Sequence, residues 1–194
     1  MIRILSQLIL IVLFSIHIYS QSNYYVSNTG SNGNNGLTIN AAFETLQHAA
    51  DIVNAGDSVF VVSGNYVGFD IRTSGNSFQP IVFKALSNDV TIDIHNPVTN
   101  DGINIENANY VEIHGFNIIN QPRAGIRIVV SDFIKAINNN CSNNFKWGIF
   151  TGFTNDNLIE GNSCSYSEDE HGIYVSNSSD RPTIINNHSF INNG

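Results

Sequence analysis

The sequence has 194 residues, eight basic and sixteen acidic, for a formal net charge of -8, which argues against nucleic-acid binding because phosphate contacts need clustered Lys and Arg. Its 30 asparagines and 15 glycines do not suit a helical bundle, whose surfaces favour Glu, Lys and Ala. A hydrophobic fraction of 42% is enough to bury a core and argues against disorder.

Residues 1–22 have the features of a secretory signal peptide. Arg3 supplies a positive start, residues 8–18 are mostly apolar, and Ser20 and Ser22 are small enough for cleavage. The eleven residues of the apolar stretch are too few to span a bilayer as a helix. We therefore expect cleavage after Ser20 or Ser22, export to the extracellular space or cell surface, and no stable membrane insertion afterwards.

The remaining residues, 23–194, are expected to form one domain that opens with an atypical segment over residues 24–56. A strand over 24–27 and a loop over 30–36 precede a helix that begins at Asn40 as its N-cap and ends at Gly56. Such a helix can cover the open end of a stack of strands. Its predicted apolar face consists of Phe43, Leu46, Ala50 and Val53.

Residues 57–101 are predicted to form irregular first coils, with strands over 57–62, 68–72, 81–85 and 90–94. A regular repeat follows over residues 102–194. Gly102, Gly125, Gly148 and Gly172 are spaced by 23, 23 and 24 residues, and each precedes an Ile-centred strand. A second strand-like run and an Asn-rich turn follow in each repeat, and Asn suits stacked turns because it tolerates left-handed backbone angles.

This period predicts an all-β, right-handed parallel β-helix with about 23 residues per coil and two or three short strands in each coil. Leucine-rich repeats are excluded because their Leu ladder is absent, and a β-sandwich would not space its glycines so evenly. The period of two within a strand directs Asn104, Arg127, Phe150 and Tyr174 outward in one column. It directs the following residues into the core: Ile103, Ile105, Ile126, Ile128, Ile149, Ile173 and Val175. Because the sequence stops in mid-repeat, we expect it to be a C-terminally truncated fragment.

The N-terminal residues also carry a resemblance. The segments 25–31, 43–47 and 54–61 resemble secreted right-handed parallel β-helix proteins of the pectate-lyase-like superfamily, most nearly polysaccharide lyase family 9. Asn32 and Ala42 depart from the Asp and Pro usual there, and no Asp-rich loop matches that family's calcium cluster. The resemblance implies an acidic-polysaccharide binder or lyase that uses calcium and a Lys base.

A cationic and aromatic strip is the candidate substrate site. Arg123 and Lys146 each lie two residues before a repeat glycine and should stack in neighbouring coils, with Arg127 nearby and Phe150 and Tyr174 above it. Arginine binds carboxylates and aromatic rings pack on sugar faces, so these five residues are predicted to bind substrate. Lys146 and Arg127 are also the predicted catalytic residues for β-elimination. The alternative is that these five residues are ordinary surface residues with no role in binding.

The acidic run Glu168, Asp169 and Glu170, followed by His171, is the candidate metal site, since carboxylate oxygens suit calcium. Asp180 could join it only if its turn folds back. A solvated turn is the alternative, and no lysine is expected at a matching position beside these acids. A weaker third option is glycoside hydrolysis by Asp156 with Glu170.

Cys141 and Cys164 are 23 residues apart and should occupy one position in consecutive coils. A free buried pair is favoured over a disulfide, because adjacent parallel strands hold the two Cβ atoms farther apart than a disulfide prefers. Trp147 is either a corner filler, which is favoured, or a sugar platform.

These features predict an exported β-helix that binds acidic polysaccharide of pectate or alginate type and, if catalytic, cleaves it by β-elimination. A non-catalytic surface or adhesion module is the alternative, and a glycoside hydrolase is the second alternative.

Overall fold

The computed structural model describes residues 21–194. The predicted signal segment lies outside the described residues, except for Gln21 and Ser22. The backbone N–H of Ser22 donates to Oδ1 of Asp57 at 2.8 Å, and its carbonyl accepts from the N–H of Ser58 at 2.9 Å. Ser22, which was expected to belong to the signal segment, is therefore hydrogen-bonded to the domain.

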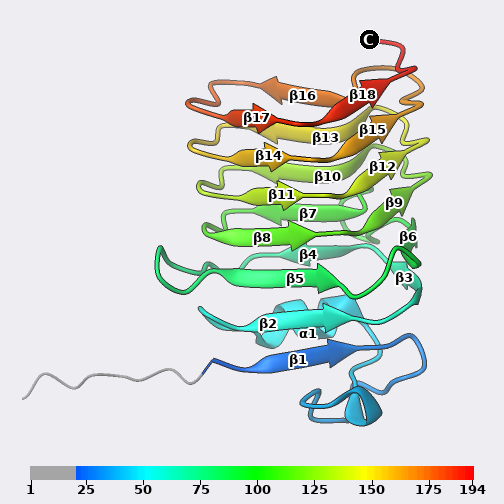
Figure 1. Cartoon of the computed structure of the whole chain (residues 1–194), viewed down its shortest axis with the longest axis vertical. Coiled ribbons are helices and arrows are strands. Elements are labelled where there is room, and N and C mark those ends of the chain that lie inside the picture. Colours follow the sequence, from blue (N-terminus) through cyan, green and yellow to red (C-terminus); the bar gives the residue numbers. More distant parts are fainter. Residues whose placement is uncertain (1–20) are drawn as a thin grey trace, which may run out of the picture.

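The chain winds as a parallel β-helix, as predicted, with three sheets that we call A, B and C (Figure 1). From β2 to β16 each coil visits sheet A, then B, then C, and every strand pairing between successive coils is parallel. Sheet A contains β1 (Asn23–Val26), β2 (Ser58–Val61), β5 (Ile81–Ala85), β8 (Val111–His114), β11 (Lys135–Ile137), β14 (Leu158–Glu160) and β17 (Thr183–Ile185). Sheet B contains β3 (Gly64–Val67), β6 (Val90–Ile94), β9 (Asn117–Ile119), β12 (Asn140–Ser142), β15 (Ser163–Ser165) and β18 (His188–Phe190). Sheet C contains β4 (Phe69–Ile71), β7 (Ile103–Glu106), β10 (Ala124–Val129), β13 (Trp147–Gly152) and β16 (Ile173–Ser176).

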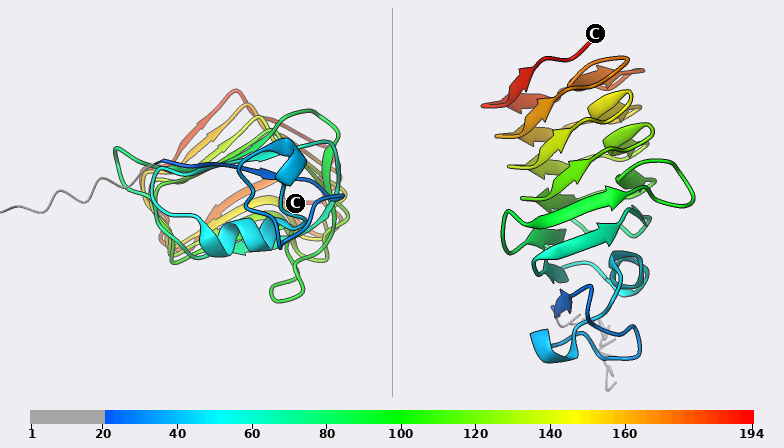
Figure 2. Two further views of the ribbon diagram at one scale, coloured as in Figure 1. Left: turned by 90° about the horizontal axis from the view of Figure 1, so that it is seen from below. Right: turned by 90° about the vertical axis from the view of Figure 1, so that its right-hand side faces the viewer.

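The repeat glycines form one column at the start of the sheet C strands, which confirms their predicted alignment. A Cβ on Gly125 would meet the carbonyl oxygen of Gly148 at 2.7 Å, and one on Gly148 would meet that of Gly172 at 2.5 Å. The column extends to Gly68, because β4 pairs with β7 in the register Phe69 to Ile103. The coil from Gly68 to Gly102 is longer than the later ones, and loops from this part of the chain project from the stack (Figure 2).

The interior is filled by the residues predicted for it. The isoleucines of β7, β10 and β13 are fully buried, whereas Ile173 and Val175 are half-buried because β16 is the last described strand of sheet C. Cys141 and Cys164 face each other in β12 and β15, and both are buried and free, as favoured by the sequence. A hydrogen bond between the two thiols, together with burial, raises the pKa of Cys141.

Asparagines stack inside the corner between sheets A and B. The side chain of Asn162 accepts from the backbone N–H and the amide of Asn139, and donates to the carbonyl of Ala136 and the amide oxygen of Asn187. Asn138 and Asn143 adopt a positive φ of 54° at the corners. Most of the Asn-rich turns were thus predicted correctly, but Asn117 and Asn140, also expected in turns, begin β9 and β12, and the strands of sheet B were not recognised individually.

The capping helix is shorter than predicted. Helix α1 spans Leu46–Ile52, and its N-cap is Thr45, whose hydroxyl accepts from the N–H of His48 at 3.2 Å. The predicted N-cap Asn40 lies instead in a 3-10 turn, η1 (Ile39–Ala41), and Val53 is the C-cap. The prediction placed the start of the helix too early because Phe43 belongs to the core without being helical. Helix α1 packs beside β4 at the N-terminal edge of sheet C (Figure 2). No helix within residues 21–194 is long and apolar enough to cross a membrane.

Candidate functional site

The outer surface of sheet C carries one column of side chains that crosses five coils. The register aligns Asp70 with Asn104, Asn104 with Arg127, Arg127 with Phe150, and Phe150 with Tyr174. Successive members are separated by one strand spacing, about 4.8 Å. The predicted stacking of Arg127, Phe150 and Tyr174 is confirmed, and we call this surface the sheet C face.

The N-terminal half of the sheet C face is a closed polar network. Nη1 of Arg127 donates to Oδ1 of Asn104 at 2.7 Å and to Oε2 of Glu106 at 3.1 Å. Nη1 of Arg72 lies 3.1 Å from the same oxygen of Glu106, and its Nη2 lies 3.3 Å from Oδ2 of Asp70. Two guanidinium groups therefore face two carboxylates, those of Glu106 and Asp70, which balances the charge locally.

Asn104 differs from its prediction, because it is fully buried although it lies on the outer side of the sheet. Its amide donates to Oδ1 of Asp70 at 2.9 Å while its oxygen accepts from Arg127. Burial alone would raise the pKa of Glu106, but the hydrogen bonds from Arg127 and Asn104 and the positive charges of Arg127 and Arg72 lower it below its usual range. Glu106 is thereby kept ionised between the two arginines.

The C-terminal half of the sheet C face is aromatic. The ring centroid of Trp147 lies 4.5 Å from that of Phe150 and 6.1 Å from that of Tyr174. The imidazole of His171 packs edge-on against Tyr174 at 4.9 Å. Trp147 is therefore not the corner filler that was favoured, because it packs with an outer cluster rather than with the core. Phe150 differs from its outward prediction because it is only 8% exposed, so the ring surface of the cluster that reaches solvent comes from the half-buried Trp147 and Tyr174.

Arg123 and Lys146 stack through their backbones as predicted, since the N–H of Lys146 donates to the carbonyl of Arg123 at 2.8 Å. Their side chains diverge. Nε of Arg123 donates to Oδ1 of the fully buried Asp101 at 2.8 Å, and its Nη2 donates to the carbonyl of Thr99 at 2.7 Å. The hydrogen bond with Asp101 raises the pKa of Arg123. Arg123 thus joins its own coil to the loop before β7, and its predicted contact with sugar stays a prediction.

Lys146 does lie beside the acidic run, which corrects the expectation that no lysine would. Its Nζ is 3.6 Å from Oδ2 of Asp169 and 3.7 Å from Oε1 of Glu170, and 5.3 Å from the ring centroid of Trp147. The prediction was wrong because Lys146 belongs to the coil before the one that carries the acidic run.

The predicted metal ligands do not converge. Asp169 and Glu170 face Lys146, whereas Glu168 lines a different depression with Gln121 and Phe145. Across residues 21–194, no three His, Cys, Asp or Glu side chains gather around a common point. The carboxylates therefore do not form the oxygen cage that calcium takes.

Asp156 and Glu170 are not brought together either. Glu170 precedes the sheet C strands and Asp156 follows them, so the length of β13, about 20 Å, separates the two. Paired carboxylates of glycosidases lie within about 10 Å. Asp156 instead forms a bidentate pair with Arg181, which lowers its pKa, and Asp180 binds the same arginine rather than the acidic run.

Sequence reasoning missed Asp70, Arg72 and Glu106. The signal was present, because Gly68-Phe69-Asp70-Ile71 matches the pattern of Gly102-Ile103-Asn104-Ile105. The spacing of 34 residues between these two glycines concealed it.

Comparisons with known proteins agree with this architecture. The profile of the family described as "Pel9A-like, right handed beta helix region" matches residues 24–194. No curated protein matches the chain in sequence. Among solved structures, pectate lyase Pel9A superposes with a TM-score of 0.76 and 17% identity, over 88% of this chain and 48% of that chain.

Two further structures are similar. GH136 lacto-N-biosidase from Eubacterium ramulus has a TM-score of 0.67 and 13% identity, over 86% of this chain and 41% of that one. A rhamnogalacturonan lyase has a TM-score of 0.59 and 20% identity, over 89% of this chain and 58% of that one. The chain thus spans about half the length of these proteins, and likeness at such identities shows the fold alone. With the profile matched over nearly the whole chain, the protein belongs to the Pel9A-like right-handed β-helix family.

Proposed function

We propose that this protein is exported and binds an acidic polysaccharide on the sheet C face. The observation that carries the proposal is the placement of Arg127 directly below Phe150 and Tyr174 in one column, with Trp147 beside them. A cation followed by aromatic rings at the spacing of one coil matches a chain whose units each offer a carboxylate and an apolar ring face. The names of the similar pectate and rhamnogalacturonan lyases support this substrate class.

Arg127 has the capacity to bind a uronate without leaving the network. Its side chain is 18% exposed, and within the described residues only its Nη1 forms hydrogen bonds. A guanidinium has five N–H donors, so the outward ones stay available to a sugar carboxylate. Glu106, one coil earlier, binds Nη1 of Arg127 and so restricts the direction of the remaining donors.

Lys146 supplies the second cation of the face. Its ammonium group lies against Trp147 and between two half-exposed carboxylates, where an incoming uronate can compete for it. Binding through exposed ion pairs of this kind is weakened by salt.

The β-elimination proposal uses the same two residues. A base removes the proton on C5 of a uronate, a double bond forms between C4 and C5, and the bond from C4 to the glycosidic oxygen breaks, with that oxygen taking up a proton. Arg127 would neutralise the carboxylate and Lys146 would accept the C5 proton. However, Lys146 aligns with Arg123 rather than Arg127, four residues or about 13 Å along the strand.

That offset favours a second candidate, the non-catalytic surface or adhesion module, in which the two cations contact different sugar units. The calcium proposal has no support from geometry either, because the three predicted carboxylates do not share a site within residues 21–194. The sheet C face therefore supports recognition of the polysaccharide more strongly than its cleavage.

The experiment is affinity electrophoresis of the full chain through gels containing polygalacturonate or alginate, at low and high salt. We expect strong retention that falls with salt, and loss of most retention in the double variant Arg127→Ala with Lys146→Ala. Lys135→Ala is the control for a lost charge, because Lys135 is exposed on sheet A and pairs with Glu112. Unchanged retention of the double variant contradicts the proposal. Absorbance of unsaturated uronate, compared between the parent and Lys146→Ala, separates the lyase from the binding module.

A further inference from the structure

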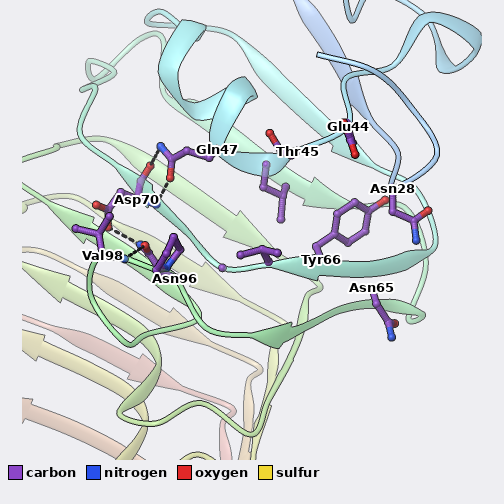
Figure 3. Close-up of a pocket in the computed structure, with 13 residues that line it drawn as sticks. Asn28, Glu44, Thr45, Gln47, Asn65, Tyr66, Asp70, Asn96 and Val98 are labelled. Carbon is purple, nitrogen blue, oxygen red and sulfur yellow. Dashed lines mark hydrogen bonds between the residues drawn. The ribbon is translucent and has the colours of Figure 1, made fainter. Parts of the chain in front are cut away.

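A groove of about 540 Å³ lies at the N-terminal end of the β-helix, where sheet B turns into sheet C (Figure 3). One wall is the start of helix α1, from Glu44 to Gln47, and the opposite wall is the segment 96–98. Strand β3 lines it between them, with Asn28 beyond one end of that strand and Asp70 at the other end. Its volume is within the usual range for pockets that bind small ligands.

The groove has apolar surface exposed to solvent. The side chain of Val67 projects outward from β3 and is 45% exposed, and Val98 on the opposite wall is 76% exposed. Leu46 and Tyr66 lie beneath this surface as buried core residues, and the Tyr66 hydroxyl is occupied by donating to the carbonyl of Val62 at 2.8 Å. This surface suits the aliphatic C–H face of a ligand.

Unused polar groups surround the apolar surface. Within residues 21–194, the carboxylate of Glu44 and the side-chain amide of Asn28 have no hydrogen-bond partner, and Asn65 uses only its Nδ2, which donates to Asp93 at 3.0 Å. Together they offer acceptors and donors that match sugar hydroxyl groups. An apolar centre with a few directed polar groups is the usual composition of a ligand site.

The groove carries negative charge, whereas the two arginines and two acids of the sheet C face balance each other. Its lining contains two acids, Glu44 and Asp70, and none of the described residues that line it is basic. Asp70 is already bound by Asn96 and Asn104 and paired with Arg72, whereas Glu44 has no cation beside it within the described residues. A uronate carboxylate placed here would meet uncompensated negative charge, which is a repulsive element against acidic units.

We infer that this groove binds an uncharged sugar unit and that Glu44 makes it reject uronates. The inference does not depend on the acidic chain proposed for the sheet C face, because the groove has its own lining and the opposite charge preference. Asp70 belongs to both surfaces, so one glycan with neutral and acidic units can occupy them together.

The test is methyl NMR of the full chain with labelled valines, titrated with two tetragalacturonides that differ only in charge, one fully methyl-esterified and one unesterified. The esterified tetramer is expected to shift the methyl signals of Val67 and Val98 in a saturable way, and the unesterified one to leave them in place. The indole N–H signal of Trp147 reports the sheet C face in the same samples, so the two proposals succeed or fail separately.

Two variants and one control complete the test. Val67→Glu should weaken binding of the esterified tetramer at least tenfold, read at Val98, and Glu44→Gln should allow the unesterified tetramer to shift both valines. Ile94→Glu is the matched control, because Ile94 pairs with Val67 in the next coil, is 55% exposed and does not line the groove. The inference is overturned if the esterified tetramer shifts neither valine, if both tetramers shift them equally, or if Ile94→Glu weakens binding as much as Val67→Glu.

Discussion

Gln47 binds both backbone groups of Asp70. Its Oε1 accepts from the N–H of Asp70 at 2.8 Å, and its Nε2 donates to the carbonyl of Asp70 at 3.2 Å. The side-chain amide thereby takes the place of a neighbouring strand at the edge of β4, which would otherwise present unpaired backbone groups. The capping helix is thus joined directly to the first residue of the sheet C face.

The first prediction is that Gln47→Ala destabilises the fold by about 1–3 kcal/mol, because the backbone groups of Asp70 lose their partners. Chemical unfolding followed by circular dichroism measures it. The comparison is Asp51→Ala, which removes only the exposed acceptor that Gln47 Nε2 also contacts at 2.8 Å. Equal effects of the two variants would show that Gln47 does not cap the strand.

Gly148 is predicted to tolerate no side chain. A methyl group there would meet the carbonyl oxygen of Gly172 at 2.5 Å and Cβ of Cys164 at 2.9 Å, so the coils must separate. Gly148→Ala should cost about 2 kcal/mol or more. Gly33→Ala, whose added methyl would meet only Oγ of Ser31 at 3.5 Å, should change stability by less than about 0.5 kcal/mol. A Gly148→Ala protein as stable as the parent would contradict the close approach of the coils.

The strands that could be predicted from the sequence are those whose pattern of buried residues is local to the strand. Glycine and isoleucine spacing predicted sheets A and C, because burial of a periodic side chain is a local property of the strand. In sheet B, β12 buries only Cys141, and the Asn and Ser that flank this residue look like turn residues. The strands of sheet B form because they pair with the strands of the neighbouring coils.

The candidate site was only partly predictable for a related reason. The outward column of Arg127, Phe150 and Tyr174 follows from the repeat, whereas the pairing of Arg127 with Glu106 depends on side chains from two coils. Arg123 has the same position relative to its glycine as Lys146, yet it binds Asp101 because the long coil before Gly102 brings that acid against it. The position of a residue in the repeat predicts which face of the sheet its side chain is on, but it does not predict which side chain of another coil it binds.

Arg123 is predicted to be a structural residue. Arg123→Ala leaves the fully buried carboxylate of Asp101 without its cation, which should cost about 3–5 kcal/mol. Adding Asp101→Asn removes the stranded charge and should restore a large part of this stability. Denaturant midpoints of the single and double variants measure the effect. Arg181→Ala, which breaks an exposed pair with Asp156, should have a much smaller effect. A larger loss for Arg181→Ala than for Arg123→Ala would contradict this role.

The lowered pKa of Glu112 should make the free energy of unfolding depend on pH. Its hydrogen bond with His114, opposed by burial and aided by Lys135, lowers its pKa from 4.5 to about 2. Because the folded value is below the unfolded one, ionised Glu112 stabilises the fold fully above about pH 4.5, and this contribution is lost as the pH falls toward 2. Glu112→Gln should therefore cost about 1–2 kcal/mol at pH 7, allowing for the exposure of Lys135, and progressively less in acid.

Unfolding free energies of the parent and Glu112→Gln between pH 7 and pH 3 provide the measurement. Glu160→Gln is the control on the same sheet, since Glu160 forms no ion pair within the described residues. A gap between the parent and Glu112→Gln that does not narrow in acid would contradict the assignment.

Trp147, the one tryptophan of the sequence, lies beside Phe150 and Tyr174 of the sheet C face, where we propose that acidic polysaccharide binds. The most direct measurement is its fluorescence during titration with oligogalacturonate, in the parent, Arg127→Ala and Lys135→Ala. We predict a saturable change in the parent and in Lys135→Ala, with an apparent dissociation constant that rises with salt, and at least a tenfold weaker response in Arg127→Ala. Oligogalacturonate binding that leaves Trp147 fluorescence unchanged, or that Arg127→Ala does not weaken, would contradict the account.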